Sequence, residues 1–290
     1  MSEPSPMFVL RRILVALDTS PQSQAALEAA VNLAAKMNAE LLGLFVEDTA
    51  LLRLVEVPCA REILYFSTAE NVLTRASMES RFRVQAEQAR KALADAARRA
   101  HVEWSFRTAR GDVASEVLAA ASDVDLLAMG KGGWSLDRKI RMGSTALELS
   151  TSSIPVLLLP ESGLPPKASL VVYYDGSPAA KRGLLAALEL EDAGMDGITA
   201  LLEAANPGEA TKLQDEINAL APRDAHNLRY LQINPDDKTS LRRALETEST
   251  GVLVLGSREL LKKLPPLDVL SRETDMSLLL LGNEPDATID

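Results

Sequence analysis

The sequence predicts an α/β protein in which two similar halves each form a parallel sheet that helices cover on both faces. Short runs such as residues 13–17 contain only apolar side chains, which is typical of strands buried on both sides in a parallel sheet. Stretches with apolar residues at helical spacing alternate with these runs, and that alternation favours a parallel α/β sheet. The same order of elements restarts after residue 167. These three observations give the fold class and the number of domains.

The first half supplies five predicted strands. The strand at residues 13–17 ends at Asp18, and Ser20 and Pro21 then provide a helix N-cap and a proline at the first helical position. Between the second and third strands we expect an irregular excursion, residues 47–70, and an amphipathic helix from about residue 78 to residue 100. The remaining strands are expected at residues 41–46, 101–107, 124–129 and 154–159.

The second half repeats this pattern. Residues 160–167 contain prolines and a glycine without periodicity, and they are predicted to form a linker. The strand that follows ends in Asp175-Gly176-Ser177-Pro178, which mirrors Asp18-Thr19-Ser20-Pro21. The runs at residues 251–256 and 276–282 correspond to the fourth and fifth strands. We therefore predict tandem domains at residues 1–161 and 168–285, because a period of this length is too long for a solenoid.

Composition and charge argue against several classes of protein. The formal net charge of −10 disfavours a general nucleic-acid binder, which needs a basic face. Residues 1–160 carry 18 Lys+Arg and 19 Asp+Glu (−1), whereas residues 161–290 carry 13 and 22 (−9). No apolar run approaches the roughly 20 residues that cross a bilayer, so we expect no membrane segment. The single cysteine, Cys59, allows no intrachain disulfide, and the first residues lack a signal-peptide pattern; we expect a cytoplasmic protein.

A glycine-rich loop follows the fourth strand of the first half. It begins Gly130-Lys131-Gly132-Gly133, and Gly143-Ser144-Thr145 comes after nine further residues. Glycines let backbone N–H groups approach an anion closely, and a helix that opens at Gly143 would offer its N-terminal N–H groups and dipole to a phosphate. Positive charge in the same loop supports this hypothesis: Lys131, Arg138, Lys139 and Arg141. The alternative is a flexible connection in which Ser144 is an ordinary N-cap.

The second half has lost most of this pattern. Its loop reads Gly256-Ser257-Arg258-Glu259, and no Gly-Ser pair opens the last helix. Glu259 stands where Gly133 stands in the first half, and a carboxylate there would repel a phosphate. We therefore predict an anion site in the first half alone.

The loop resembles the nucleotide motif of the universal stress protein family, G-x2-G-x9-G-[S/T], which Gly130, Gly133, Gly143 and Ser144 fit at every spacing. The resemblance covers residues 9–160 well and residues 168–282 more weakly, as in a tandem member. It implies two Rossmann-like domains of the adenine nucleotide α-hydrolase-like type, each with a five-stranded sheet of order 3-2-1-4-5. Family members pair through their last strands, so residues 154–159 and 276–281 are expected to pair within one chain, and a homodimer is an additional expectation.

The resemblance also implies the ligand and the residues that hold it. An adenine nucleotide, commonly ATP, would bind at the carboxyl ends of the strands, where open α/β sheets place their ligands; AMP and ADP are alternatives, and Mg²⁺ could accompany a triphosphate. Asp18 and Ala16 would lie at the adenosine end, Val46 would contact adenine, and Met129 and Gly130 would lie near the ribose and first phosphates. The phosphate chain would be held by Gly133, Gly143, Ser144 and Thr145, with Lys131 as a further candidate outside the family motif.

Other nucleotide-dependent classes fit poorly. Enzymes that split ATP into AMP and pyrophosphate carry Ser-Gly-Gly-x-Asp-Ser after the first strand, and residues 17–21 lack both glycines. A P-loop needs G-x4-G-K-[S/T], and Lys131 is followed by glycine. No Cys/His cluster suggests zinc, and no base–nucleophile pair stands out. We expect a nucleotide-binding regulatory or stress-response protein rather than an enzyme; slow ATP hydrolysis and a nucleotide-independent interaction protein remain the alternatives.

Overall fold

The computed structural model describes residues 9–54, 61–62, 71–72, 74–131, 154–165, 167–221, 227–248, 251–257 and 275–282. The structural statements below concern these residues.

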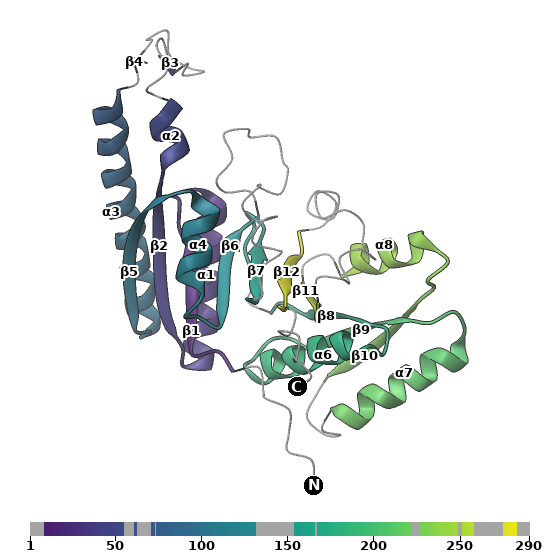
Figure 1. Ribbon diagram of the computed structural model, residues 1–290. Coiled ribbons are helices and arrows are strands. Elements are labelled where there is room, and N and C mark those ends of the chain that lie inside the picture. Colours follow the sequence, from purple (N-terminus) through teal and green to yellow (C-terminus); the bar gives the residue numbers. More distant parts are fainter. Residues whose placement is uncertain are drawn as a thin grey trace, which may run out of the picture.

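The first half forms one side of a ten-stranded sheet (Figure 1). Along this sheet its strands follow the order β5-β2-β1-β6-β7, all parallel, which is the order 3-2-1-4-5 implied by the resemblance. A separate pair, β3 (Arg61–Glu62) and β4 (Asn71–Val72), lies within the excursion after β2. The five strands are β1 (Arg12–Ala16), β2 (Glu40–Asp48), β5 (Trp104–Gly111), β6 (Leu126–Gly130) and β7 (Val156–Leu159).

The second half repeats the same order, β10-β9-β8-β11-β12. Its strands are also parallel to one another. Their bounds are β8 (Leu170–Tyr174), β9 (Ile198–Glu203), β10 (Leu228–Ile233), β11 (Val252–Leu255) and β12 (Ser277–Leu280).

The two halves meet through their fifth strands, as the family resemblance implied. β7 and β12 pair antiparallel, with Leu158 opposite Leu278 and Leu157 opposite Leu279. Because this one pair is antiparallel, the strands of the two halves run in opposite directions. The carboxyl ends of the first-half strands and those of the second-half strands therefore lie at opposite edges of the sheet. The amino end of β12 therefore lies beside the carboxyl end of β7.

Helices cover both faces of the sheet (Figure 1). On the face that we call the α1 face lie α1 (Pro21–Met37), α3 (Arg75–Ala100), α6 (Pro178–Asp192) and α7 (Pro207–Leu220). The opposite α4 face carries α4 (Val113–Ala121) and α8 (Lys238–Thr247), and a short helix, α2 (Thr49–Leu54), follows β2. Alternate side chains of β1 enter the two cores, Ile13 on the α1 face and Leu14 on the α4 face.

Local signals explain where the first helix of each half begins. The Ser20 side chain accepts a hydrogen bond from the backbone N–H of Ser23, and Ser177 does the same for Ala180; a proline follows each cap. α3 begins a few residues before the predicted start because Thr74 forms a capping box with Ser77.

The third strand differs from its predicted bounds of 101–107. His101 caps α3 in the left-handed region, with φ 58°, so the strand begins only at Trp104. It then runs on to Gly111, because it pairs with β2 residue by residue as far as Asp48. Within the described residues, no helix has both the length and the apolar character that crossing a membrane requires.

Candidate functional site

The candidate site lies at the carboxyl ends of β1, β2 and β6. β1 is paired with β2 on one side and with β6 on the other, so the chain connections of this half reverse direction at β1. Ligands of open α/β sheets bind in the crevice outside the strand ends at such a switch point. Ala16, Val46 and Met129 come together here: all three belong to the core on the α4 face and are at most 2 % exposed. The carboxyl ends of these three strands therefore carry apolar side chains that pack in the core.

Asp18 is fixed by the turn that joins β1 to α1. Its Oδ1 accepts hydrogen bonds from the backbone N–H of Ser20 (3.0 Å) and the Ser20 hydroxyl (2.5 Å), and its own N–H donates to Ser23 Oγ (3.0 Å). Asp18 therefore caps the turn. Within the described residues, the hydrogen bonds that the Asp18 carboxylate accepts both end on Oδ1. Thr19 has φ 63°, an uncommon conformation for a non-glycine residue, whereas the second half uses Gly176 (φ 77°) at this position.

Gly130 has a packing role that the sequence did not reveal. A Cβ at this position would lie 2.5 Å from Cβ of Gln22 in the first turn of α1, closer than real contacts allow. Gly256, its counterpart, has the same relation to α6, where a Cβ would lie 1.6 Å from the carbonyl oxygen of Ala179. Both halves need a glycine here because the helix crosses close to the strand end. Gly130 alone is therefore not evidence of a phosphate site.

The Lys131 side chain is directed toward the second half. Its Nζ donates a hydrogen bond to the backbone carbonyl of Met276 at the start of β12, and its backbone N–H donates to the carbonyl of Leu159 (2.8 Å). Burial lowers the pKa of the Lys131 amine to about 8, and the negative charge of Asp275 opposes that shift. In this structure the amine is engaged between the halves.

The remaining predicted residues, Gly133, Gly143, Ser144 and Thr145, lie outside the described part of the chain, as does Glu259. Their roles stay predictions. Within the described residues, no group of three or more His, Cys, Asp or Glu side chains could hold a metal ion.

The equivalent edge of the second half is filled by larger side chains. Ile13 pairs with Leu41 in one half, and Leu170 pairs with Ile198 in the other, so one offset of 157 positions relates both strand pairs. By this offset, Tyr173 and Glu203 stand where the first half has Ala16 and Val46.

Tyr173 and Glu203 contact each other directly. The Tyr173 hydroxyl donates a hydrogen bond to the Glu203 carboxylate, and the tyrosine is only 3 % exposed. Burial, together with the bond to Glu203, raises the pKa of the Tyr173 phenol well above its usual range. Sequence reasoning missed this pair: the offset between the repeats marks Tyr173 and Glu203 as the counterparts of Ala16 and Val46, but their contact depends on the register of β8 and β9.

Comparison with known proteins agrees with this architecture. Residues 10–160 match the Universal stress protein family. A universal stress protein from Archaeoglobus fulgidus DSM 4304 superimposes with a TM-score of 0.67 at 16 % identity, over 93 % of this chain and 98 % of that one. A candidate universal stress protein from Pseudomonas aeruginosa UCBPP-PA14 gives 0.56 at 14 % identity, over 95 % and 94 %. At these identities the two structures show a shared fold across both halves. The curated proteins gave no match.

Proposed function

The chain belongs to the universal stress protein family, and on that premise we propose that it binds one adenine nucleotide in its first half. ATP is the expected ligand, with AMP and ADP as alternatives, and Mg²⁺ would accompany a triphosphate. We place the protein in the cytoplasm, in a regulatory or stress-response role without efficient catalysis. Slow hydrolysis of ATP and a nucleotide-independent scaffold are the competing functions.

The observation that carries this proposal is the difference between the two strand edges. At the first edge, Ala16 and Val46 are small and apolar, which suits contact with the flat face of a purine. At the second edge, the phenol of Tyr173 and the carboxylate of Glu203 occupy the equivalent positions and bond to each other. A nucleotide there would have to displace a buried tyrosine. The sequence motif also favours a site in the first half alone, since the position of Gly133 is occupied by Glu259 in the second half.

The expected arrangement follows from the ends of the strands. Val46 and Ala16 would contact the adenosine, and the side of the Asp18 carboxylate that the turn does not use could accept a hydrogen bond from it. The phosphates would extend from Gly130 toward Gly143 and Ser144, whose helix N-terminus favours negative charge.

Isothermal titration with ATP and with AMP tests the proposal. We expect one site per chain for at least one of the two nucleotides. Gly133→Glu, which copies the second loop, should abolish binding while leaving the melting temperature unchanged. Ser162→Glu is the control: it adds the same charge at an exposed linker position and should leave the affinity unchanged.

The outcomes separate the parts of the proposal. No heat of binding with either nucleotide would refute nucleotide binding and favour the scaffold function. Two sites per chain would contradict the claim that the second edge is closed. Unchanged affinity in Gly133→Glu would show that this loop does not bind the phosphates.

A further inference from the structure

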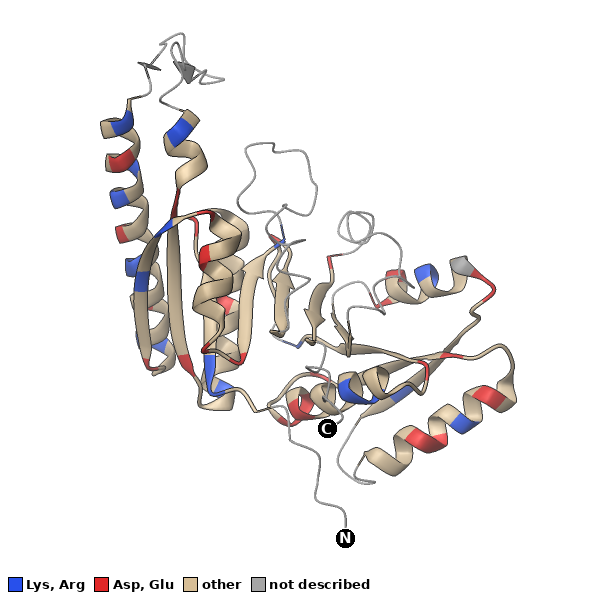
Figure 2. Ribbon diagram, viewed as in Figure 1, with Lys and Arg blue, Asp and Glu red and all other residues tan. Residues whose placement is uncertain are grey.

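Helix α3 and strand β5 carry a local excess of positive charge in an acidic chain. α3 contains seven Arg or Lys and three Asp or Glu residues, a net charge of +4, whereas the whole chain has −10. On β5, Arg110 already pairs with Glu47 and Glu79. Arg107 lies on the α4 face of the sheet, as Ala109 does. Figure 2 marks the positions of the basic residues along α3, while acidic residues predominate on α7. The surface of α3 is therefore more basic than the chain as a whole.

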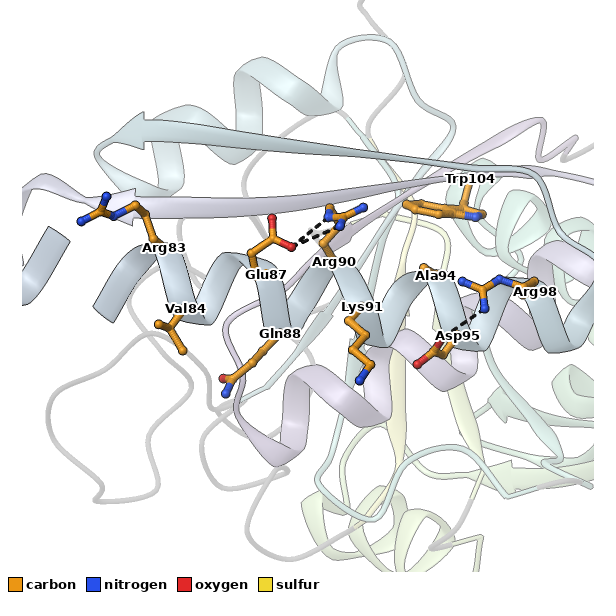
Figure 3. Close-up of a pocket in the computed structure, with 10 residues that line it drawn as sticks. All are labelled: Arg83, Val84, Glu87, Gln88, Arg90, Lys91, Ala94, Asp95, Arg98 and Trp104. Atoms are coloured by element: carbon orange, nitrogen blue, oxygen red, sulfur yellow. Dashed lines mark hydrogen bonds and ion pairs between the residues drawn. The ribbon is translucent and has the colours of Figure 1, made fainter. Parts of the chain in front are cut away.

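An open groove of about 620 Å³ runs along the outer side of α3 (Figure 3). It extends from Arg83 and Val84 to Arg98, and the Trp104 ring of β5 lies over its far end. Val84 is 55 % exposed, which is unusual for a valine on a helix, and Trp104 is half-buried. The groove thus combines positive charge with two apolar contact points.

Two of the four cations in the groove already have acidic partners. Arg90 pairs with Glu87 (3.2 Å), and Arg98 pairs with Asp95 (3.4 Å). For Arg83 and Lys91, no ion pair is recorded within the described part of the chain. These two residues are eight positions apart on the helix, about 12 Å at 1.5 Å per residue.

We propose that this groove binds an extended, acidic peptide segment of another protein. An extended chain advances about 3.3 Å per residue, and every second side chain faces the same way, so carboxylates at positions i and i+4 are about 13 Å apart. That spacing matches the rise between Arg83 and Lys91 along the helix axis; their side chains leave α3 on different sides (Figure 3), so the bound segment would lie between them. An apolar side chain at i+6 would reach Trp104. The recognised pattern is two acidic residues with three between them, followed two positions later by an apolar residue.

The edge strand supports an extended ligand. β5 is the terminal strand of the ten-stranded sheet, and within the described part of the chain β2 is its one paired strand, so its other edge is open to pairing with an added strand. Extended peptides bind such edges by adding a strand.

A nucleic acid fits the groove less well. The carboxylates of Glu87 and Asp95 lie between the cations, where a continuous polyphosphate backbone would meet them. A peptide can place uncharged residues at those points. The net charge of −10 on the chain also opposes a polyanion that extends beyond the groove.

Fluorescence anisotropy with two labelled peptides tests the proposal. The peptide GSESTSESLSG carries the proposed spacing, and GSEESTSSLSG has the same composition with adjacent acids. We expect the intact protein to bind the first peptide several-fold more tightly than the second. Arg83→Glu combined with Lys91→Glu should weaken binding by at least about tenfold, because both proposed partners become repulsive. Val84→Ser should weaken it less.

The matched control reverses two other exposed lysines, Lys167→Glu with Lys212→Glu, and so changes the total charge equally. Binding in this control should stay within about twofold of the original if local charge, not net charge, decides. Circular dichroism establishes that each variant is folded. Equal affinity for both peptides, full binding by the α3 variant, or no binding at about 1 mM peptide would overturn the proposal. Tighter binding of a thymidine oligonucleotide would assign the groove to nucleic acid instead. None of these measurements requires ATP.

Discussion

The side-chain amine of Lys131 donates a hydrogen bond to the backbone carbonyl of Met276, so the end of β6 in the first half is tied to the start of β12 in the second. The contact exists because β7 and β12 are antiparallel, which brings the amino end of β12 to the carboxyl edge that carries the candidate site. On the α1 face, Lys36 makes a similar bond to the carbonyl of Gly194 (2.9 Å). Two lysines of the first half thus contact backbone carbonyls of the second.

Lys131 should give the protein a distinctive dependence of stability on pH. Its pKa is about 8 in the folded protein, against an ordinary value of 10.5. Between these values the unfolded chain holds a proton that the folded chain has released, so the free energy of unfolding should rise with pH over this interval. Below about pH 8 the Lys131 amine is protonated in both the folded and the unfolded chain, so this residue adds no pH-dependent stability there.

Urea unfolding at several pH values between 7 and 10.5 measures this effect, with Lys131→Met as the variant. The difference in unfolding free energy between the original protein and the variant should grow as pH rises. Lys212→Met removes an exposed lysine and is the control. Its unfolding free energy should change with pH in the same way as that of the original protein. A parallel curve for Lys131→Met would contradict the burial of this amine.

The glycines that begin the two loops should both be needed for stability, independently of any contact that Gly130 makes with a nucleotide. Gly130→Ala and Gly256→Ala each push a methyl group into the first turn of a helix, and overpacking of this kind costs about 1–3 kcal/mol. Gly256→Ala should have the larger effect, since the carbonyl of Ala179 is nearer. Gly208→Ala in α7, where the nearest atom is a side-chain oxygen at 3.3 Å, is the control and should leave stability unchanged or raise it by up to about 1 kcal/mol, because alanine is the better helix former. Thermal unfolding measures the stability of the three variants. Equal stability of all three would refute the packing role of Gly130 and Gly256.

Much of the fold was readable from the sequence because the signals are local. Ser20-Pro21 and Ser177-Pro178 each specify a helix start through one side chain and one ring, and both helices begin there. The buried strands are apolar on both faces, so their runs are continuous and easily located. The resemblance to universal stress proteins then implied the pairing of the fifth strands, which the structure shows.

The features that escaped prediction depend on neighbours distant in sequence. The length of β5 is set by β2, and the contact between Tyr173 and Glu203 appears only once the register of β8 and β9 is known. The direction of Lys131 depends on the antiparallel junction. No single-residue preference encodes such relationships.

The bond between Tyr173 and Glu203 should stabilise the second half without serving a ligand. Tyr173→Phe removes the phenol that donates to the carboxylate, and a hydrogen bond to a charged acceptor contributes about 1.5–3 kcal/mol. Tyr230→Phe is the matched control: its hydroxyl donates to the neutral Asn218 side chain (2.7 Å) at an exposed position, so the loss should be about 0.5 kcal/mol. The nucleotide stoichiometry of Tyr173→Phe should remain that of the original protein. An equal loss in both variants, or an additional bound nucleotide, would contradict this interpretation.

Two ion pairs across neighbouring strands should differ in strength because only one has a buried acceptor. Arg110 donates to Glu47 (2.6 Å) from β5 to β2, and the Glu47 side chain is 12 % exposed. Arg12 donates to Glu40 (3.0 Å) from β1 to β2, and both side chains are about half exposed, at 47 % and 50 %.

Arg110→Met should lower the free energy of unfolding by about 1–3 kcal/mol, because it leaves an enclosed carboxylate without the cation recorded beside it. Arg12→Met should lower it by no more than about 0.5 kcal/mol, since water already solvates that pair. Adding Glu47→Gln to Arg110→Met should recover part of the loss, because the carboxylate that lacks a partner is then neutral. Urea titrations of the three variants measure these differences. Losses of equal size at the two pairs, or no recovery in the double variant, would show that burial of Glu47 does not set the strength of its pair.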